Sequence, residues 1–257
     1  MNRLQTEFQR LYLCGAADAD GDAPGELIDP QGRVRALVLE LARPADWEPL
    51  ALVWRGVQTD LGWPAPGIAV SGTDGLQLWF SLTEPVDVVQ AQVFLTQLQT
   101  RYLPDITPRR LGLMPMSDAS TSPPTLLHAR PVPAQQAQTG HWAVFVAPDL
   151  APVFAETPWL DIPPNDDGQA KLLRGLQSTT PAEWRDALTL LNPASAPAHA
   201  PELGRAATDH CPTPGNSPAG AAAQAEAGRF LQSVMNDEAA PLALRVEAAK
   251  ALLRGAD

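Results

Sequence analysis

The sequence predicts an α+β fold: a split βαβ unit whose antiparallel or mixed sheet carries helices on one face, followed by a C-terminal helical hairpin. Residues 34–41 form an apolar run typical of a strand, and apolar residues alternate, as in strands, on both sides of a glycine-containing turn at 71–75. Apolar residues recur at helical spacing at 47–61 and 88–103. The resulting order, β-α-β-β-α-β, is typical of ferredoxin-like and RRM-like sheets.

The length, charge and cysteine count narrow the class of protein. A chain of 257 residues can bury one good core, with room for a small second unit. The net charge of −11 argues against broad, charge-driven binding to DNA or acidic membranes, although a local basic groove is compatible with it. Two isolated cysteines, Cys14 and Cys211, fit a cytoplasmic location. The sequence has no cluster of cysteines and histidines, so no metal site is predicted. It also has no apolar run that approaches the ~20 residues of a membrane span.

Capping residues predict where the helices begin. The first helix covers residues 2–13, with its apolar face at Leu4, Phe8, Leu11 and Tyr12. Asp46 and Asp87 are the expected N-caps of the next two helices. A short helix is expected at 168–177. The sequence Thr180-Pro181-Ala182-Glu183 is a capping box with proline at the first helical position, which predicts a further helix.

The later part of the core is expected to add short strands and a wrapping segment. Strands are predicted near 110–114, 126–130 and 142–146, and nearby prolines place the last two at sheet edges or in an added hairpin. The acidic, proline-rich segment 147–167 is expected to wrap the domain. Its predicted anchors are the large apolar residues Phe154, Trp159, Leu160 and Ile162.

Composition divides the chain into three parts. Residues 1–191 form the predicted α+β core. Residues 192–220 are rich in Ala, Pro and Gly and are expected to be a disordered linker. Residues 221–257 are expected to form a helical hairpin that docks on the core or binds a protein partner. The acidic stretch at 18–22 is similar to the start of a calcium loop but lacks its final Glu, so a solvated loop is the other interpretation.

One motif points to a family. The turn Ser71-Gly72-Thr73-Asp74-Gly75 leads into Gln77-Leu78-Trp79, about thirty residues after a strand–helix unit. This arrangement resembles the archaeo-eukaryotic primase-polymerase superfamily, in which an SGxxGxH turn begins a strand and its His contacts the nucleotide. Gln77 stands in place of that His, and the Gln-x-Trp pattern is similar to that of plasmid-type replication primases.

The resemblance implies a palm in which carboxylates hold divalent metals. The family's first motif has two acidic residues at the end of the first core strand, whereas this chain has Glu40 and then Ala42. For the third motif, Asp105 and Asp118 lie nearby in sequence, but neither falls in a predicted strand. The implied catalytic centre is therefore degraded or rebuilt, and no cofactor is established. Mg²⁺ or Mn²⁺ is expected only if the chain is an active nucleotidyltransferase, which one carboxylate does not support.

The candidate catalytic residues are Glu40, Ser71 and Gln77, and the candidate nucleic-acid contacts are Gln77, Trp79, Arg109 and Arg110. Trp79 can stack on a base only if it faces solvent. Each residue also has a structural interpretation, because the turn can be an ordinary hairpin and the arginines can balance nearby acids.

Two functional hypotheses follow. In the first, the chain is a catalytically degenerate, primase-like bacterial protein of DNA replication or maintenance, with a mobile element as one of the settings considered. It would bind nucleotide or single-stranded DNA. In the second, it is a non-enzymatic scaffold whose tethered C-terminal hairpin binds a protein partner.

Overall fold

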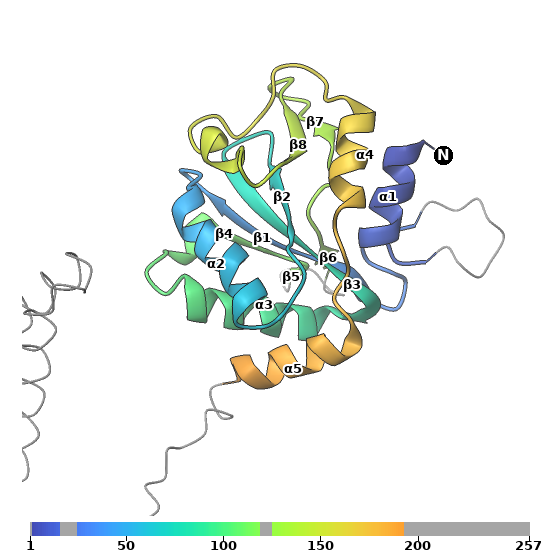
Figure 1. Cartoon of the computed structure of the whole chain (residues 1–257), viewed down its shortest axis with the longest axis vertical. Helices are drawn as coiled ribbons and strands as arrows, with labels where there is room; N and C mark the ends of the chain where they lie inside the picture. Colours follow the sequence, from blue (N-terminus) through green and yellow to red (C-terminus); the bar gives the residue numbers. More distant parts are fainter. Residues whose placement is uncertain (1, 16–24, 119–124, 193–257) are drawn as a thin grey trace, which may run out of the picture. The chain divides into compact units, whose positions relative to one another are not determined.

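The computed structural model describes residues 2–15, 25–118 and 125–192. These form an α+β fold around a six-stranded sheet with the strand order β4-β1-β3-β2-β8-β7, in which every neighbouring pair is antiparallel (Figure 1). The strands are β1 (Arg33–Ala42), β2 (Gly67–Val70), β3 (Gly75–Asp87), β4 (Leu111–Met114), β7 (Ala134–Gln135) and β8 (Trp142–Val146). A separate two-stranded sheet pairs β5 (Met116–Asp118) with β6 (Thr125–Leu127).

Three of the helices begin where the capping residues predict, whereas the short helix expected at 168–177 covers Asp166–Arg174 and has Asn165 as its N-cap. The helices are α1 (Arg3–Tyr12), α2 (Trp47–Thr59), α3 (Val88–Tyr102), α4 (Asp166–Arg174) and α5 (Pro181–Leu191). The side chains of Asp46 and Asp87 accept hydrogen bonds from the first turns of α2 and α3. Thr180 and Glu183 form the predicted capping box of α5.

The prediction that helices cover one face of the sheet is wrong. Helices α2 and α3 pack on one face, against residues such as Leu39 and Phe80, while α1 and α4 cover the other (Figure 1). All four residues of β2 and the first eight of β3 are buried, and a strand buried on both sides needs a layer on each face. The second face carries Ala36, Val38, Ala69, Trp79, Ala143 and Phe145.

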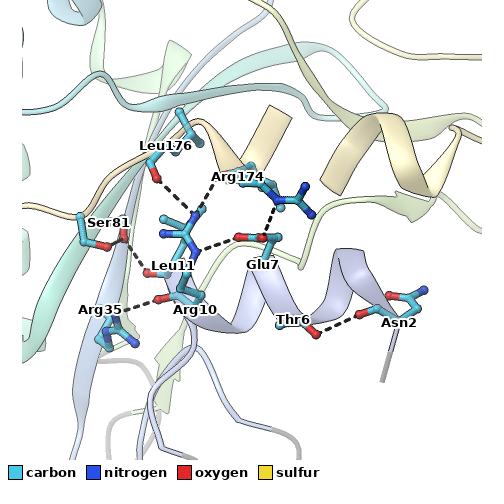
Figure 2. A network of polar contacts seen from close by, with 11 residues as sticks. Asn2, Thr6, Glu7, Arg10, Leu11, Arg35, Ser81, Arg174 and Leu176 are labelled. Carbon is cyan, nitrogen blue, oxygen red and sulfur yellow. Dashed lines mark hydrogen bonds and ion pairs between the residues drawn. The ribbon is translucent and has the colours of Figure 1, made fainter. Parts of the chain in front are cut away.

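Polar contacts fasten α1 between the sheet and α4 (Figure 2). The guanidinium of Arg10 donates to the carbonyls of Leu173 and Leu176, at 3.0 and 3.3 Å. Glu7 lies between Arg10 and Arg174 and pairs with both, at 2.8 and 3.2 Å. These contacts fix α1 in position, so its apolar face, which contains Phe8, packs on the sheet.

The later strands join the sheet as a hairpin. β8 lies inside the sheet beside β2, and β7 forms the edge, so 142–146 is not itself an edge strand. The 147–167 segment returns to β8 through reciprocal backbone hydrogen bonds between Trp142 and Leu160, and Trp159 stacks on His141. Ile162 is 69% exposed, so it is not the anchor that the sequence predicts.

Several predictions lie outside the described residues. These are the acidic stretch at 18–22, the linker and the C-terminal hairpin. Among residues 2–15, 25–118 and 125–192, none of the helices combines the length and apolar character needed to cross a membrane.

Candidate functional site

The side chain of Ser71 holds the turn between β2 and β3. Its Oγ accepts hydrogen bonds from the backbone N–H groups of Thr73 and Gly75, at 3.2 and 3.0 Å. Gly72 has a φ of +77°, a conformation that residues with a side chain rarely adopt. Ser71 is buried, and in this structure its hydroxyl shapes the turn that starts β3.

β1 and β3 bring Glu40 and Gln77 together. The two residues are 37 positions apart in sequence but lie directly opposite each other in the antiparallel register. Nε2 of Gln77 donates to Oε2 of Glu40 at 2.9 Å, and Nε1 of the Trp79 indole donates to Oε1 of Gln77 at 2.9 Å. The result is a chain of hydrogen bonds from a buried indole to a half-buried carboxylate, on the sheet face that α1 and α4 cover.

Two glycines leave space for the Glu40 carboxyl group. A Cβ atom at Gly75 of β3 would lie 2.4 Å from Oε1 of Glu40, which is closer than atoms can approach. A Cβ atom at Gly112 of β4 would lie 3.3 Å from Cβ of Glu40 and 3.9 Å from its Oε2. The carboxyl group therefore fills the space above Gly75. On the other side of Glu40, β4 has Gly112, which carries no side chain.

Burial raises the pKa of the Glu40 carboxyl group above its usual range, because a charged group loses its hydration there. The hydrogen bond from Gln77 opposes this shift by stabilising the carboxylate. The negative charge of Asp74 raises the same pKa, and the positive charge of Arg43 lowers it. Glu40 is thus a carboxyl group whose protonation depends on its immediate neighbours.

Glu40 lines a groove of about 610 Å³ at the β4 edge of the sheet. β4 and the end of β1 form one side, and the uncharged side chains of Gln92, Thr96 and Gln99 on α3 form the other. The charged residues that line the groove are Glu40, Arg43 and Arg110. The groove thus has one carboxylate and two guanidinium groups, although the chain as a whole is strongly acidic.

The two arginines also tie β1 to the segment before β4. Arg110 donates to the carbonyls of Ala42 and Pro44, at 3.3 and 2.8 Å. Arg43 donates to the carbonyl of Arg109, and its guanidinium lies 4.0 Å from the carboxylate of Asp74. Each guanidinium has five N–H donors, so these contacts leave others free to bind an anion.

The structure separates some residues that the sequence grouped. Trp79 is fully buried against Phe8, Tyr12 and Phe145, so the condition for stacking a base on it is not met. Arg101 precedes Arg109 and Arg110 by a few residues in the sequence, but it pairs with Asp60 at 3.3 Å and lies outside the groove. Within the described part of the chain, neither Arg109 nor Arg110 forms an ion pair, so the balancing role considered for them is not seen.

Sequence reasoning missed two residues of this site, Arg43 and Gly112. Arg43 directly follows the apolar run of β1, and Gly112 interrupts the apolar run of β4, so each residue stands out from its neighbours in the sequence. Neither signal indicates which strands are neighbours, and only that adjacency places Gly112 beside Glu40.

The described residues contain no group of three or more His, Cys, Asp or Glu side chains arranged to hold a metal ion. Asp105 follows the end of α3 and does not line this groove; it lines a second groove with Asp46 and Tyr102. Asp118 is in β5, which belongs to the separate two-stranded sheet.

Replacing Gly75 with alanine is expected to break the Glu40–Gln77 hydrogen bond, because the new methyl group needs the space of the carboxyl group. Such overpacking typically costs about 1–3 kcal/mol, measurable as a lower free energy of unfolding in urea. Gly168→Ala is the matched control, since a Cβ atom there meets only ordinary contacts within α4. Equal stability of the Gly75→Ala variant and the wild type would show that the carboxyl group moves without cost.

No protein-family model matches the chain, and no curated protein matches it. Among solved structures, it is similar to the AEP domain of the primase-polymerase (PrimPol) of cyanophage S-2L. The identity is 17%, the match covers 55% of this chain and 61% of that chain, and the TM-score is 0.25. A TM-score of this size does not establish a shared fold, so the function must be argued from the residues of the site.

Proposed function

We propose that the chain is a primase-like protein of DNA replication or maintenance that binds nucleotide or single-stranded DNA and has a degenerate catalytic centre. The ligand binds in the groove at the β4 edge. The observation that carries this proposal is the local charge: two guanidinium groups and uncharged amides line a groove in a chain of net charge −11. A cationic groove on an acidic protein favours a phosphate-bearing ligand at that place over binding across the whole surface.

The sheet topology supports the primase-like part of the proposal. β1, α2, β2, β3, α3 and β4 follow one another in the chain, and their strands take the order β4-β1-β3-β2. We take this unit to be a split βαβ arrangement. In it, the turn at Ser71 opens the strand that carries Gln77, and Gln77 faces the groove carboxylate Glu40.

The end of β1 supports the proposal that the catalytic centre is degenerate. The family that the motif resembles has a second acidic residue in this strand, and the residue here is Ala42, which lies opposite Gly75. A two-metal centre needs several carboxylates against the triphosphate, and β1 contributes one. Glu40 and Gln77 are then ligand-binding residues in a site that retains the shape of a palm.

Fluorescence anisotropy of labelled single-stranded DNA at low and physiological salt tests this function. Binding should weaken with salt because the arginines release counterions from phosphates. Arg110→Ala is the direct variant, since it removes a guanidinium that lines the groove, and it should weaken binding and lower the salt slope by about one. Arg109, the neighbouring candidate, is exposed but does not line the groove. Gln77→Ala should also weaken binding.

Arg185→Ala is the matched control, because it removes the same charge from the exposed surface of α5, away from the groove. It should leave the anisotropy curve unchanged. Circular dichroism of each variant establishes that it is folded. Absence of binding by the wild type at tens of micromolar, the weak end of non-specific affinities, would refute the nucleic-acid function.

A further inference from the structure

Gln77 contacts a residue of the groove but does not line the groove itself. Its side chain is only 7% exposed, whereas its hydrogen-bond partner Glu40 is one of the lining residues. The buried indole of Trp79 fixes the Gln77 amide, because an indole N–H can only donate and must therefore meet the carbonyl oxygen, Oε1. The amide nitrogen, Nε2, then points to Glu40. An effect of Gln77 on a ligand in the groove must therefore pass through Glu40.

Two contacts hold the Glu40 carboxyl group toward β3. Its Oε2 accepts the hydrogen bond from Gln77, and its Oε1 occupies the space above Gly75. Gln77 and Gly75 both belong to β3, which pairs with one edge of β1. The other edge of β1 pairs with β4, whose four residues line the groove. The carboxyl group is thus held on the side of β1 that faces away from the open edge of the sheet.

The two guanidinium groups of the groove keep their positive charge. Within the described residues, Glu40 forms no ion pair, although Arg43 lies close enough for its charge to lower the pKa of the carboxyl group. Arg110 donates to backbone carbonyl groups, which carry no net charge. Arg43 also donates to a backbone carbonyl, and its ion pair with Asp74 is long, at 4.0 Å, and exposed to screening by solvent. A pair between Glu40 and either arginine would neutralise one of the two positive charges that a phosphate can meet.

We propose that Gln77 is a positioning residue: its hydrogen bond holds the Glu40 carboxylate toward β3 and so keeps Arg43 and Arg110 free to bind phosphate. This inference rests on the proposed function and gives a role in it to a residue that does not touch the ligand. Without the Gln77 amide, the Glu40 carboxylate has no hydrogen-bond donor among the described residues. A half-buried carboxylate without a donor is costly, and the guanidinium groups of the same groove can supply one.

Gln77→Ala is therefore expected to act on binding as the loss of one arginine does. Labelled single-stranded DNA is titrated at several salt concentrations and at about pH 8, above the ordinary pKa of a glutamate, with fluorescence anisotropy as the readout. The variant should bind more weakly, and its salt slope should fall by about one, because the freed carboxylate neutralises one guanidinium group.

The decisive variant combines Gln77→Ala with Glu40→Gln. The double variant has no carboxylate to pair with the arginines, so it should recover the wild-type salt slope and affinity. Glu40→Gln alone should bind at least as tightly as the wild type, because it removes a negative charge from the groove. Glu84→Gln makes the same charge change at an exposed position of β3, and adding it to Gln77→Ala should restore nothing.

Gln169→Ala is the matched control for the loss of a buried glutamine. Gln169 is also 7% exposed, and its amide bonds to the backbone of Phe145, at 2.8 and 2.9 Å, outside the groove. This variant should lose stability but keep the wild-type salt slope. Circular dichroism establishes that each variant is folded. If Gln77→Ala does not fold, Trp79→Phe with and without Glu40→Gln provides a second pair, because it frees the same amide.

The outcomes separate this inference from the proposed function. If the wild type does not bind single-stranded DNA, both fail. If the wild type binds and Arg110→Ala weakens binding, the groove holds DNA as proposed. The positioning role is then refuted if Gln77→Ala keeps the wild-type slope, or if Glu40→Gln does not restore the slope that Gln77→Ala has lost.

Discussion

Replacement of Trp79 with alanine is expected to lower the free energy of unfolding by about 3–5 kcal/mol, the usual cost of truncating a buried tryptophan. Trp79 is fully buried at the centre of an aromatic cluster, with ring centroids at 5.2 Å from Tyr12 and 5.9 Å from both Phe8 and Phe145. The substitution leaves a cavity between the sheet and α1. It also removes the N–H donor that orients the amide of Gln77. Urea denaturation measures the loss of stability.

Trp79→Phe separates the two effects of that substitution. The phenyl ring keeps most of the packing but has no N–H, so Oε1 of Gln77 loses its hydrogen-bond donor in a buried place. Leaving a buried acceptor unpaired costs about 1–3 kcal/mol. Because the amide is then free to turn, Glu40 loses a fixed partner and binding of single-stranded DNA in the groove should weaken although the protein remains folded. Trp79→Phe with wild-type stability and wild-type binding of single-stranded DNA would contradict the positioning role of the indole.

Phe94→Ala is expected to cost a similar amount, about 3–5 kcal/mol, on the opposite face of the sheet. Phe94 is fully buried in α3 and contacts Trp63 and Trp184, with ring centroids 4.6 and 4.9 Å away. Its loss weakens the packing of α3 against α5 and against the sheet. Thermal unfolding, followed by circular dichroism, measures the effect.

The neighbouring residue on α3 provides the control for Phe94. Val93 is 47% exposed, so Val93→Ala should change stability by no more than about 0.5 kcal/mol. Phe94→Ala protein that is still folded should bind single-stranded DNA as the wild type does, because Phe94 does not line the groove. A change in DNA affinity of the Phe94→Ala variant would show that the packing of α3 and the groove are coupled.

Local chemistry in the sequence was sufficient to predict most elements. Helix starts depend on one side chain and the next few N–H groups, so Asp46, Asp87 and the box at Thr180 were recognisable without tertiary information. The turn at 71–75 is likewise closed by its own residues, through Ser71. The second helical layer was not predictable in this way, because nothing near the strands shows that α1 and α4 pack on them.

The candidate site shows the same division. The sequence by itself determined that Glu40 lies in a strand, that Gln77 follows a tight turn, and that the chain is acidic overall. Only the tertiary structure decided that Gln77 faces Glu40, that Gly112 lies beside it and that Trp79 is buried. The physical reason is register: strand pairing joins residues that are far apart in sequence, and a shift of one residue would turn each side chain to the other face.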